Sequence, residues 1–388
     1  MWLLVQSFIV YTFFALTLYN ISRSVSVRES FLMQNTHRWY YLIRKYWWCV
    51  AIFSFISGVR WDVGIDYLSY LDDYNKALRG EEWARGRGIE EGFSFIVDTF
   101  SFLGLHPVIF FTFLAFIQIF FFMLAMKEER KVLPYMLLFL ILGNAYLSWM
   151  NGIRQMIVAC MFVWASSFIY EKKIIKFIFF IFFAYLFHHS VVILLPLFFL
   201  AYDKSIWDKR WLNIYIVIFC FIFGNMPVWV SLVERFGDAI SFIGYDYYAG
   251  KLDKLVDIEK FKSYSFGPRK IVIFIVYLFS IYYYPYYRKY FINGKFDLYF
   301  KLFFIGVCAY YLFDNTIVIF RRPVRYFDIF ALPIVGYTLS YLKYSKRSLY
   351  RIMFASSISF LYLQCVADIS VQESLRKSSL FQFYFFNE

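Results

Sequence analysis

Seven ionisable residues stand out in this sequence. Five lie at the edges of apolar segments, where a charge is costly and usually marks a site or a pathway, and two lie in a polar stretch between such segments. Three of them could transfer protons: Asp66, Glu90 and His188. Four are arginines that could bind an anion: Arg154, Arg321, Arg322 and Arg325. Carboxylates and imidazole serve in acid–base catalysis, whereas guanidinium groups bind phosphate or carboxylate bidentately. Whether these seven residues can act together depends on the helices and loops that position them.

Those elements are membrane helices. Hydrophobic residues make up 61% of the 388 residues and charged residues 17%, with 52 Phe and 35 Tyr. A soluble chain of this length could not bury so much apolar surface, and repeated apolar runs of about 17–20 residues fit membrane-spanning helices. We therefore expect an all-α, polytopic integral membrane protein. The five cysteines lie in apolar runs without metal-ligand spacing, so they predict neither a zinc site nor a disulfide framework.

The apolar runs predict about twelve spans, some of them short or re-entrant, in a single polytopic membrane domain over residues 1–388. The expected spans are Trp2–Asn20, Tyr46–Val59, Pro107–Met126, Leu133–Trp149, Gly152–Tyr170, Ile174–Phe187, Ser190–Tyr202, Trp211–Val230, Lys270–Tyr287, Phe296–Phe313, Pro323–Leu342 and Leu349–Ala367. The first run lacks a basic n-region and a cleavage site, so we interpret it as a retained helix. The sixth and seventh could form a hairpin that does not fully cross.

Two long loops interrupt these spans. The first, residues 60–106, is polar from Arg60 to Phe93, with five Arg/Lys against eight Asp/Glu, and must lie outside the lipid. Its segment Phe93–Leu105 has apolar residues at helical spacing, which predicts an amphipathic helix at the interface. The second loop covers residues 231–269.

The distribution of basic residues orients the chain. Six short loops carry 21 Lys/Arg and all fall on one side, which is therefore the cytoplasmic side. Both long loops and both termini then face outward. This bias explains the net charge of +13, which accordingly does not predict nucleic-acid binding. The sequence holds no nucleotide-binding motif, so the chain cannot by itself be an ATP-driven pump.

On this topology the seven ionisable residues reach the outer level, where they predict an outward-facing polar cavity. Each group also has a plainer interpretation. Arg154 could extend its side chain to the interface, and His188 and His189 could form a polar hairpin tip. The arginines within residues 321–325 run against the positive-inside bias, so an anion should compensate them. That anion is either an acid of the first loop or a bound group such as a pyrophosphate.

The first loop has its own plain interpretation, that of a solvated helix. Four of its residues share one helical face, which could stack on sugar rings or pack against the bundle: Tyr67, Tyr70, Leu71 and Tyr74. Gly64 favours a turn, after which the helix would begin with Asp66 as its N-cap. From spacing alone, Asp66 is a cap as readily as a catalytic base.

Five short motifs in this order resemble those of the EpsG family of Wzy-like bacterial polysaccharide polymerases. They are Gly64, Asp66 and Tyr70 in GxDYxxY; Glu90, Gly92 and Phe93 in the acid before Gly-Phe; Asn151, Arg154 and Gln155 in NxIRQ; Phe187, His188 and Ser190 in FHxS; and Arg322, Tyr326 and Phe327 in RxxxYF. The resemblance covers roughly residues 1–345. The chain departs from the pattern at His189, Arg321 and Arg325, and the 231–269 loop matches nothing in it.

The resemblance implies a membrane glycosyltransferase. Such polymerases join oligosaccharide repeat units, with donor and acceptor both carried on undecaprenyl diphosphate, at the outer face of the bacterial cytoplasmic membrane. The expected partners are these lipid-linked glycans and the bilayer, and a chain-length regulator is a further candidate. No nucleic acid, cofactor or metal is expected.

Residue roles follow from the same resemblance. Arg322, helped by Arg154, Arg325 and Arg321, would bind the diphosphate leaving group. The base that takes the acceptor's proton is His188 or Asp66, with Glu90 as a third candidate, and the sequence does not decide between them. Glycan contacts are expected from Arg60, Asp62, Tyr67, Tyr70, Gln155 and Tyr326.

Two other classes of membrane protein compete with this interpretation. A flippase for a lipid-linked glycan, or a carrier of an anionic solute, should have ionisable residues near mid-membrane and on both faces. Here they crowd at the outer face, with Lys301 and Asp328 as exceptions. A membrane acyltransferase would need a cytoplasmic entry path for its acyl thioester, which an outward-facing His188 does not offer.

Overall fold

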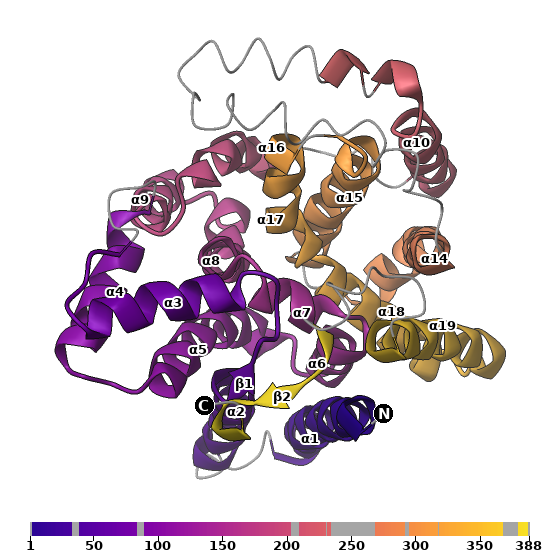
Figure 1. The fold of residues 1–388 in the computed structure, drawn as a ribbon. Coiled ribbons are helices and arrows are strands. Elements are labelled where there is room, and N and C mark those ends of the chain that lie inside the picture. Colours follow the sequence, from indigo (N-terminus) through magenta and orange to yellow (C-terminus); the bar gives the residue numbers. More distant parts are fainter. Residues whose placement is uncertain are drawn as a thin grey trace. The chain divides into compact units, whose positions relative to one another are not determined.

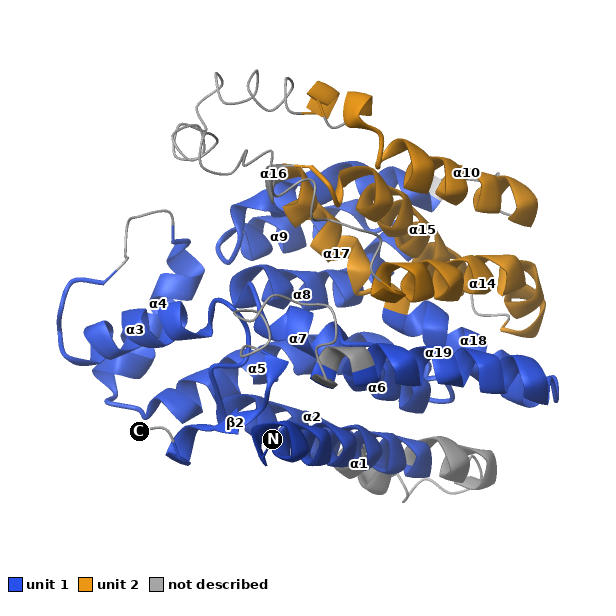
Figure 2. Ribbon diagram, turned by 45° about the vertical axis from the view of Figure 1, so that its right-hand side comes forward, with its two compact units in different colours: residues 1–202, 332–388 blue, residues 203–331 orange. Residues whose placement is uncertain are grey.

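The computed structural model describes residues 2–32, 39–83, 89–202, 209–229, 231–233, 268–291, 295–316, 318–367 and 379–386, most of which are helical (Figure 1). The chain divides into two compact units (Figure 2): unit 1 comprises residues 1–202 and 332–388, and unit 2 comprises residues 203–331. Whether the two units form one domain stays a prediction.

Unit 1 is a bundle of apolar helices. Its longer elements are α1 (Trp2–Leu32), α2 (Trp39–Gly58), α5 (Pro107–Ala125), α6 (Leu133–Leu142), α8 (Ile153–Tyr170), α18 (Ala331–Tyr344) and α19 (Ser348–Ala367). Helix α5 packs against α2 and α8, and α1 packs against α2 and α6. Neighbouring side chains alternate between core and surroundings: Phe14 and Phe53 are fully buried, whereas Phe13 and Phe55 are exposed. Helices that face lipid on one side show this pattern.

Among the described residues, five helices are long and apolar enough to cross a membrane: Trp2–Ser24, Pro107–Glu128, Ile153–Tyr170, Pro268–Tyr290 and Lys295–Phe313. Shorter apolar helices occur at Tyr46–Gly58, Leu133–Leu142, Ile174–Tyr185, His189–Ala201 and Ser348–Leu363. The prediction of a helical membrane protein is therefore confirmed. The count of about twelve spans and the outward-facing cavity stay predictions.

The expected span Leu133–Trp149 is wrong as one continuous helix. Helix α6 ends at Leu142, and the short helix α7 (Ala145–Met150) follows a turn. Within that turn Asn144 has a φ of 67°, the left-handed conformation that Asn tolerates and that a right-handed helix cannot continue.

The expected span Pro323–Leu342 is also interrupted. Two residues separate the end of the short helix α17 (Arg325–Asp328) from the start of α18 at Ala331. Pro333 lies in the first turn of α18, where its missing N–H is tolerated. In a continuous helix it could not donate to the carbonyl of Ile329, four residues earlier, and its ring would clash with that carbonyl.

The expected hairpin consists of α9 (Ile174–Tyr185) and a 3₁₀ helix, η3 (His189–Tyr202), which pack against each other and against α8. Helix α9 has 12 residues, a length of about 18 Å against the roughly 30 Å of bilayer hydrocarbon. Pro196 lies inside η3 and cannot donate to an α-helical ladder. Whether these elements fully cross stays a prediction.

The first long loop is folded around two short helices that contact each other, α3 (Tyr67–Leu78) and α4 (Glu91–Phe102). Helix α3 begins directly after Asp66, as predicted. Helix α4 covers most of the expected helical segment Phe93–Leu105, with Phe93 buried and Phe102 89% exposed. Its place at the membrane interface stays a prediction.

A two-residue strand pair, which the sequence did not predict, joins this loop to the C-terminal segment. Strand β1 (Arg60–Trp61) is antiparallel to β2 (Gln382–Phe383), with Arg60 opposite Phe383. The backbone N–H of Tyr384 then donates to the carbonyl of Val59 at 2.8 Å. The C-terminal segment therefore lies on the same side of the membrane as the start of the loop. That this side is the outer one stays a prediction.

The same segment is tied to α1. The N–H of Phe381 donates to the hydroxyl of Ser7 at 2.8 Å, and the Gln6 amide donates to the carbonyl of Phe381 at 3.2 Å. Tyr11 donates to the carbonyl of Ser379 at 2.8 Å. Residues 379–386 therefore fasten β1 to the first helix.

Unit 2 is a smaller helical group. Its elements are α10 (Arg210–Phe223), α14 (Pro268–Tyr290), α15 (Lys295–Phe313), α16 (Val318–Arg321), η4 (Arg322–Val324) and α17. Helix α15 packs against α10, α14 and α17. The contact with α17 is close, since a Cβ added at Gly306 would come within 2.5 Å of the Phe327 Cβ. Most of the second long loop, residues 231–269, lies outside the described residues.

Candidate functional site

A buried carboxylate, Glu90, is the centre of a polar cluster in unit 1. It stands immediately before α4 and is 3% exposed. Its Oε2 pairs with the guanidinium of Arg154 in the first turn of α8. Its Oε1 lies 2.7 Å from Nδ1 of His188, which follows α9. Three segments that are distant in the sequence therefore meet at one carboxylate.

The charges in this cluster keep Glu90 ionised. Burial acts to raise the pKa of its carboxyl, but the hydrogen bond with His188 and the positive charge of Arg154 outweigh burial and hold the pKa below its ordinary value. An ionised carboxylate can only accept hydrogen bonds, so Nδ1 of His188 must carry the hydrogen of this contact. In a neutral ring the lone pair then lies on Nε2.

The Nε2 atom of His188 is buried and has no hydrogen-bond partner among the residues that the structure describes. The side chain of His188 as a whole keeps 16% of its exposure. The lone pair on Nε2 is therefore the proton acceptor of this cluster that no described group occupies. The neighbouring His189 differs, because it is exposed and stacks on Tyr185 with ring centroids 4.4 Å apart.

A close backbone contact fixes the distance between Glu90 and His188. The N–H of Gly92 donates to the carbonyl of Leu186 at 2.7 Å. A Cβ at Gly92 would lie 2.7 Å from that same oxygen, so glycine is required for α4 to approach the turn after α9. This contact explains the glycine that follows the acid in the sequence motif.

Asp66 is positioned by a different helix from the one predicted. It lies at the N-cap position of α3, but its side chain makes no capping hydrogen bond there. Its Oδ2 instead accepts from the N–H of Gly152 at 3.0 Å, at the start of α8. Acids are favoured at that end of a helix, where N–H groups lack partners. Asp66 therefore attaches the loop to the helix that carries Arg154.

Gly64 makes the second close approach between these segments. Its φ is +100°, and a Cβ there would meet the carbonyl oxygen of Met150 at 2.7 Å. The backbone of the loop consequently lies directly against the turn that precedes α8. Gly64 and Gly92, the glycines of two motifs, each allow two backbone segments beside the cluster to pack closely.

Aromatic rings hold the guanidinium of Arg154 in place. Its Cζ lies 5.7 Å from the centroid of the Phe93 ring, and it shares a hydrogen bond with the Tyr70 hydroxyl. Burial raises the pKa of Tyr70, and Arg154 opposes that shift. No role for Phe93 was predicted from the sequence, although the Gly-Phe pair after the acid could have indicated one. Gln155 is buried beside Arg154 in the sequence, at 4% exposure.

The remaining aromatic face of α3 packs against α5. Tyr67 stacks on Phe111 with centroids 4.7 Å apart, and Tyr74 stacks on Phe110 at 4.2 Å. Both tyrosines are fully buried. Burial favours the packing interpretation for these two rings, since a sugar must reach a ring to stack on it. The expected glycan contact of Tyr67 gains no support here.

Arg60 is buried at the entrance to the loop, at 1% exposure. Its guanidinium lies beside the stacked rings of Tyr67 and Phe111, 5.2 and 5.1 Å from their centroids. It donates to the backbone carbonyls of Ser57 and Val63. Arg60 therefore braces the turn that leads into α3. The expected glycan contacts of Arg60 and of its half-buried neighbour Asp62 stay predictions.

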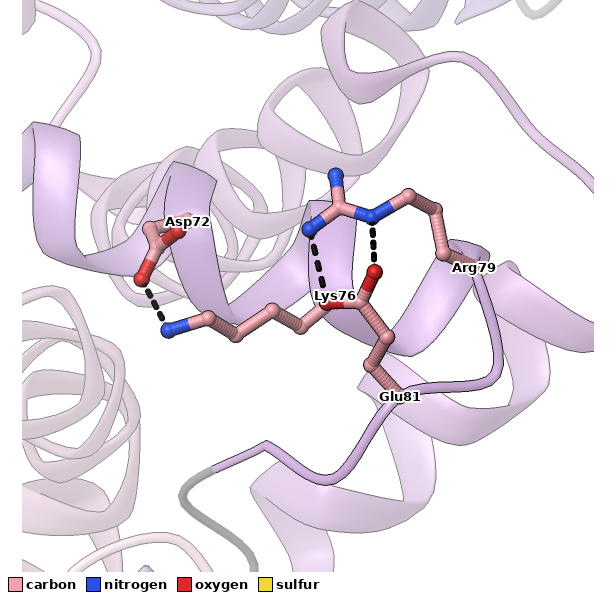
Figure 3. Close-up of polar contacts among 4 residues, drawn as sticks. All are labelled: Asp72, Lys76, Arg79 and Glu81. Atoms are coloured by element: carbon pink, nitrogen blue, oxygen red, sulfur yellow. Dashed lines mark hydrogen bonds and ion pairs between the residues drawn. The ribbon is translucent and has the colours of Figure 1, made fainter.

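Two exposed acids, Asp72 on α3 and Glu81 just beyond its end, are paired locally (Figure 3). Asp72 lies 2.5 Å from Lys76, and Glu81 accepts two hydrogen bonds from Arg79, at 2.5 and 2.9 Å. Such exposed pairs belong to a solvated surface and contribute little to stability. These two acids have partners within the loop itself.

The arginines of the fifth motif belong to unit 2. Arg322 is exposed, and Arg321 and Arg325 are half-exposed. Asp328 follows Arg325 on α17, close enough for their charges to interact. Asp328, and not only an acid of the first loop, is thus one source of compensation for the charge of Arg325. The buried Tyr326 lies on α17 as well. That these residues face the Glu90 cluster stays a prediction.

Metal-binding geometry is not evident in the part of the chain that the structure describes, where no group of three or more His, Cys, Asp or Glu side chains could hold an ion. The chemistry that this cluster supports is proton transfer at His188 and anion binding at an arginine. The expectation that the reaction needs neither metal nor cofactor stays a prediction.

Several membrane-length helices with a buried Arg–Glu–His cluster at helix ends define a polytopic helical membrane protein. Comparison with known families narrows that class. The EpsG family pattern matches residues 45–380, and the chain belongs to the EpsG family. No curated protein and no solved structure matches the chain. Family membership makes this a membrane protein of the polysaccharide polymerase type.

Proposed function

We propose that this protein is a glycosyltransferase that polymerises a bacterial surface polysaccharide. It joins oligosaccharide repeat units carried on undecaprenyl diphosphate, at the outer face of the cytoplasmic membrane. Family membership supports the polymerase type. The observation that carries a catalytic site is the contact of Glu90 with both Arg154 and His188, because it unites three motifs that are separated in the sequence.

His188 is the base in this proposal. Its Nδ1 is held by Glu90, and its Nε2 has no partner among the described residues. Glu90 is less suited to the role, since both of its oxygens are engaged and its lowered pKa makes it a weak base. Asp66 is less suited as well, because its carboxylate already holds the N–H of Gly152.

The proposed step is a displacement at the anomeric carbon of the donor. A hydroxyl of the acceptor glycan attacks this carbon, and the new C–O bond forms as the bond to the diphosphate oxygen breaks. The hydroxyl proton passes to Nε2 of His188, and the departing diphosphate keeps the bonding electron pair. Glu90 stabilises the imidazolium that results, as an ionised carboxylate does beside a charged histidine.

The negative charge of the leaving diphosphate requires a cation. Arg322, with Arg325 and Arg321 beside it in the sequence, is the proposed anchor, and Arg154 assists from α8. Losing one preorganised donor of this kind typically costs about 2.7–4 kcal/mol in the barrier. Arg322 and Arg154 should therefore both be needed for chain growth.

A deletion strain complemented with variants tests this proposal. Cells that lack the protein should accumulate single lipid-linked repeats at the outer face, and the wild type should restore a polymer ladder. His188→Ala, Arg154→Ala and Arg322→Ala should each leave single repeats at normal protein level. Full-length polymer from all three variants would show that the site assignment is wrong.

The same strain separates the polymerase from a flippase. A missing polymerase leaves the repeat units on the outer leaflet, where an added glycosidase or a periplasmic ligase can reach them. A missing flippase traps the donor on the inner leaflet. Donor found only on the inner leaflet of the deletion strain would favour the transporter alternative.

A further inference from the structure

An apolar groove of about 510 Å³ lies on the surface of unit 1 between α8 and α9, and Phe121 of α5 closes one side. Its lining is aromatic and aliphatic apart from Lys176. On α8 it is lined by Met161, Trp164 and Phe168, and on α9 by residues from Ile175 to Phe183. Eight positions of α-helix separate those last two residues, so the groove extends about 12 Å along α9. Its volume is in the range of ligand sites.

The groove and the Glu90 cluster share the same two helices. Helix α8 begins with Arg154 in its first turn, and α9 leads directly into His188. Near the C-terminal end of α9 the groove reaches Phe183, whose ring contacts that of Phe187 with centroids 5.5 Å apart. Phe187 directly precedes His188. The apolar surface is therefore continuous with the proposed site.

We propose that this groove binds the polyprenyl tail of the lipid-linked donor. The inference rests on the proposed function. A polyprenyl diphosphate whose head group lies at Arg154 and His188 must lead its tail from that point into the hydrocarbon of the bilayer. The groove begins at Phe183, five residues before His188, and is apolar apart from Lys176. It is open to the lipid, since Phe179 is 69% exposed and Ile175 is 81% exposed.

The groove also has one rigid wall. The Trp164 ring contacts Phe168 at 4.9 Å and Phe121 at 5.6 Å between centroids. A wall of packed aromatic rings gives a chain a fixed surface, which the fluid tails of surrounding lipids do not. An ordered tail would hold the anomeric carbon of the donor at a constant depth beside Nε2 of His188, and positioning of this kind lowers a reaction barrier.

Helix α9 supplies a matched pair of variants. Phe179 lines the groove, whereas Phe182 does not, although both are exposed to a similar extent, 69% and 67%. Purified full-length protein would be assayed with two donors that carry the same glycan and diphosphate, one with a long polyprenyl tail and one with a short prenyl tail. Phe179→Ser should raise KM for the long-tailed donor by about tenfold, the effect of losing one ring contact, and leave KM for the short-tailed donor unchanged.

Phe182→Ser should behave as the wild type does with both donors. Equal effects of Phe179→Ser and Phe182→Ser, or a wild type that does not distinguish the two tails, would overturn the groove assignment. A wild type that forms no polymer from either donor would count against the proposed function. Failure of the groove assignment and failure of the proposed function therefore give different results.

A second measurement does not depend on turnover. A polyprenyl diphosphate without sugar, carrying a photoreactive group in its tail, should label peptides that contain Trp164 or Phe179. Unlabelled polyprenyl diphosphate should prevent this labelling, and phosphatidylglycerol at the same concentration should not. Equal competition by phosphatidylglycerol would show that the groove takes ordinary lipid and would overturn the proposal.

Discussion

Oε1 of Glu90 lies 2.7 Å from Nδ1 of His188, although the two residues are 98 positions apart in the chain. The second oxygen of the same carboxylate pairs with Arg154. Glu90 therefore orients a histidine and an arginine at once. In a water-poor setting, such a carboxylate fixes which ring nitrogen of the histidine is available for chemistry.

Replacement of His188 by alanine should remove the proposed base. We expect kcat to fall by about 10²–10⁴-fold, the usual contribution of a positioned acid or base, with little change in KM. The adjacent His189 offers a matched control, because its exposed ring is stacked on Tyr185 and is not part of the cluster. Steady-state polymerisation rates of the two alanine variants would measure the difference. Equal losses in both would argue against His188 as the base.

Asp66 should tolerate a change that a catalytic base would not. Asp66→Asn keeps an oxygen that can accept from the N–H of Gly152, so activity should stay within a few-fold of the wild type. Asp66→Ala removes the acceptor and should lower stability by about 1.5 kcal/mol, near the low end for a hydrogen bond to a charged group because the site is half-exposed. Thermal unfolding and activity would be measured on both variants. Complete inactivity of a well-folded Asp66→Asn would restore Asp66 as a candidate base.

Stability should depend on pH through Glu90. Because its pKa is lowered in the folded protein, ionised Glu90 contributes stability above the ordinary pKa of glutamate, about 4.3. That contribution should disappear as the pH falls through the lower pKa of the folded state. Glu90→Gln should therefore be less stable than the wild type near neutral pH and approach it in acid. Melting temperatures of the two proteins from pH 7 downward would test this, and a constant gap would contradict the assigned shift.

Gly92→Ala should disturb the site without removing any of its charges. The added Cβ would lie 2.7 Å from the carbonyl oxygen of Leu186, so α4 and the turn before His188 must move apart. We expect a loss of about 1–3 kcal/mol in stability, as for other overpacked sites, together with a lower kcat. Thr99→Ala, at a half-exposed position of α4, is a suitable comparison. Unchanged activity in Gly92→Ala would mean that the spacing of Glu90 and His188 is not set here.

Removal of residues 379–388 should loosen the first loop. This segment contains β2, which pairs with β1 in the register of Arg60 opposite Phe383. We expect faster amide hydrogen exchange at Trp61 and through α3, because the strand pair and its bonds to α1 are lost. Removal of residues 387–388 alone leaves β2 in place and serves as the control. Identical exchange in both truncated proteins would contradict a bracing role for β2.

Much of the site could be predicted because its residues lie in short sequence patterns that indicate local structure. Asp66 before an aromatic helical face gave the start of α3, and the apolar periodicity after Glu90 gave α4. The order of the motifs brought together residues that the structure places in one cluster.

What could not be predicted depends on tertiary contacts. No local pattern reveals that Asp66 accepts a hydrogen bond from the start of α8 and not from α3. Nor does one reveal that Glu90 is the carboxylate that contacts His188. Nor does spacing reveal that Tyr67 turns to α5 while Tyr70 turns to Arg154, since both lie on one predicted face. The strand pair involves two residues on each side, too few for a periodic signal.

The bonds between α1 and the C-terminal segment have a consequence for the order of assembly. Chain synthesis at about 5–20 residues per second separates Gln6 from Phe381, 375 positions later, by roughly 20 to 75 s. During that interval the first loop has no β2 to pair with, and the turn braced by Arg60 is open on one side. The loop that carries Asp66 and Glu90 thus reaches its final form only after the helices it attaches to have entered the membrane. Synthesis of residues 379–386, and not insertion of the helices, would then be the step that completes the bracing of this site.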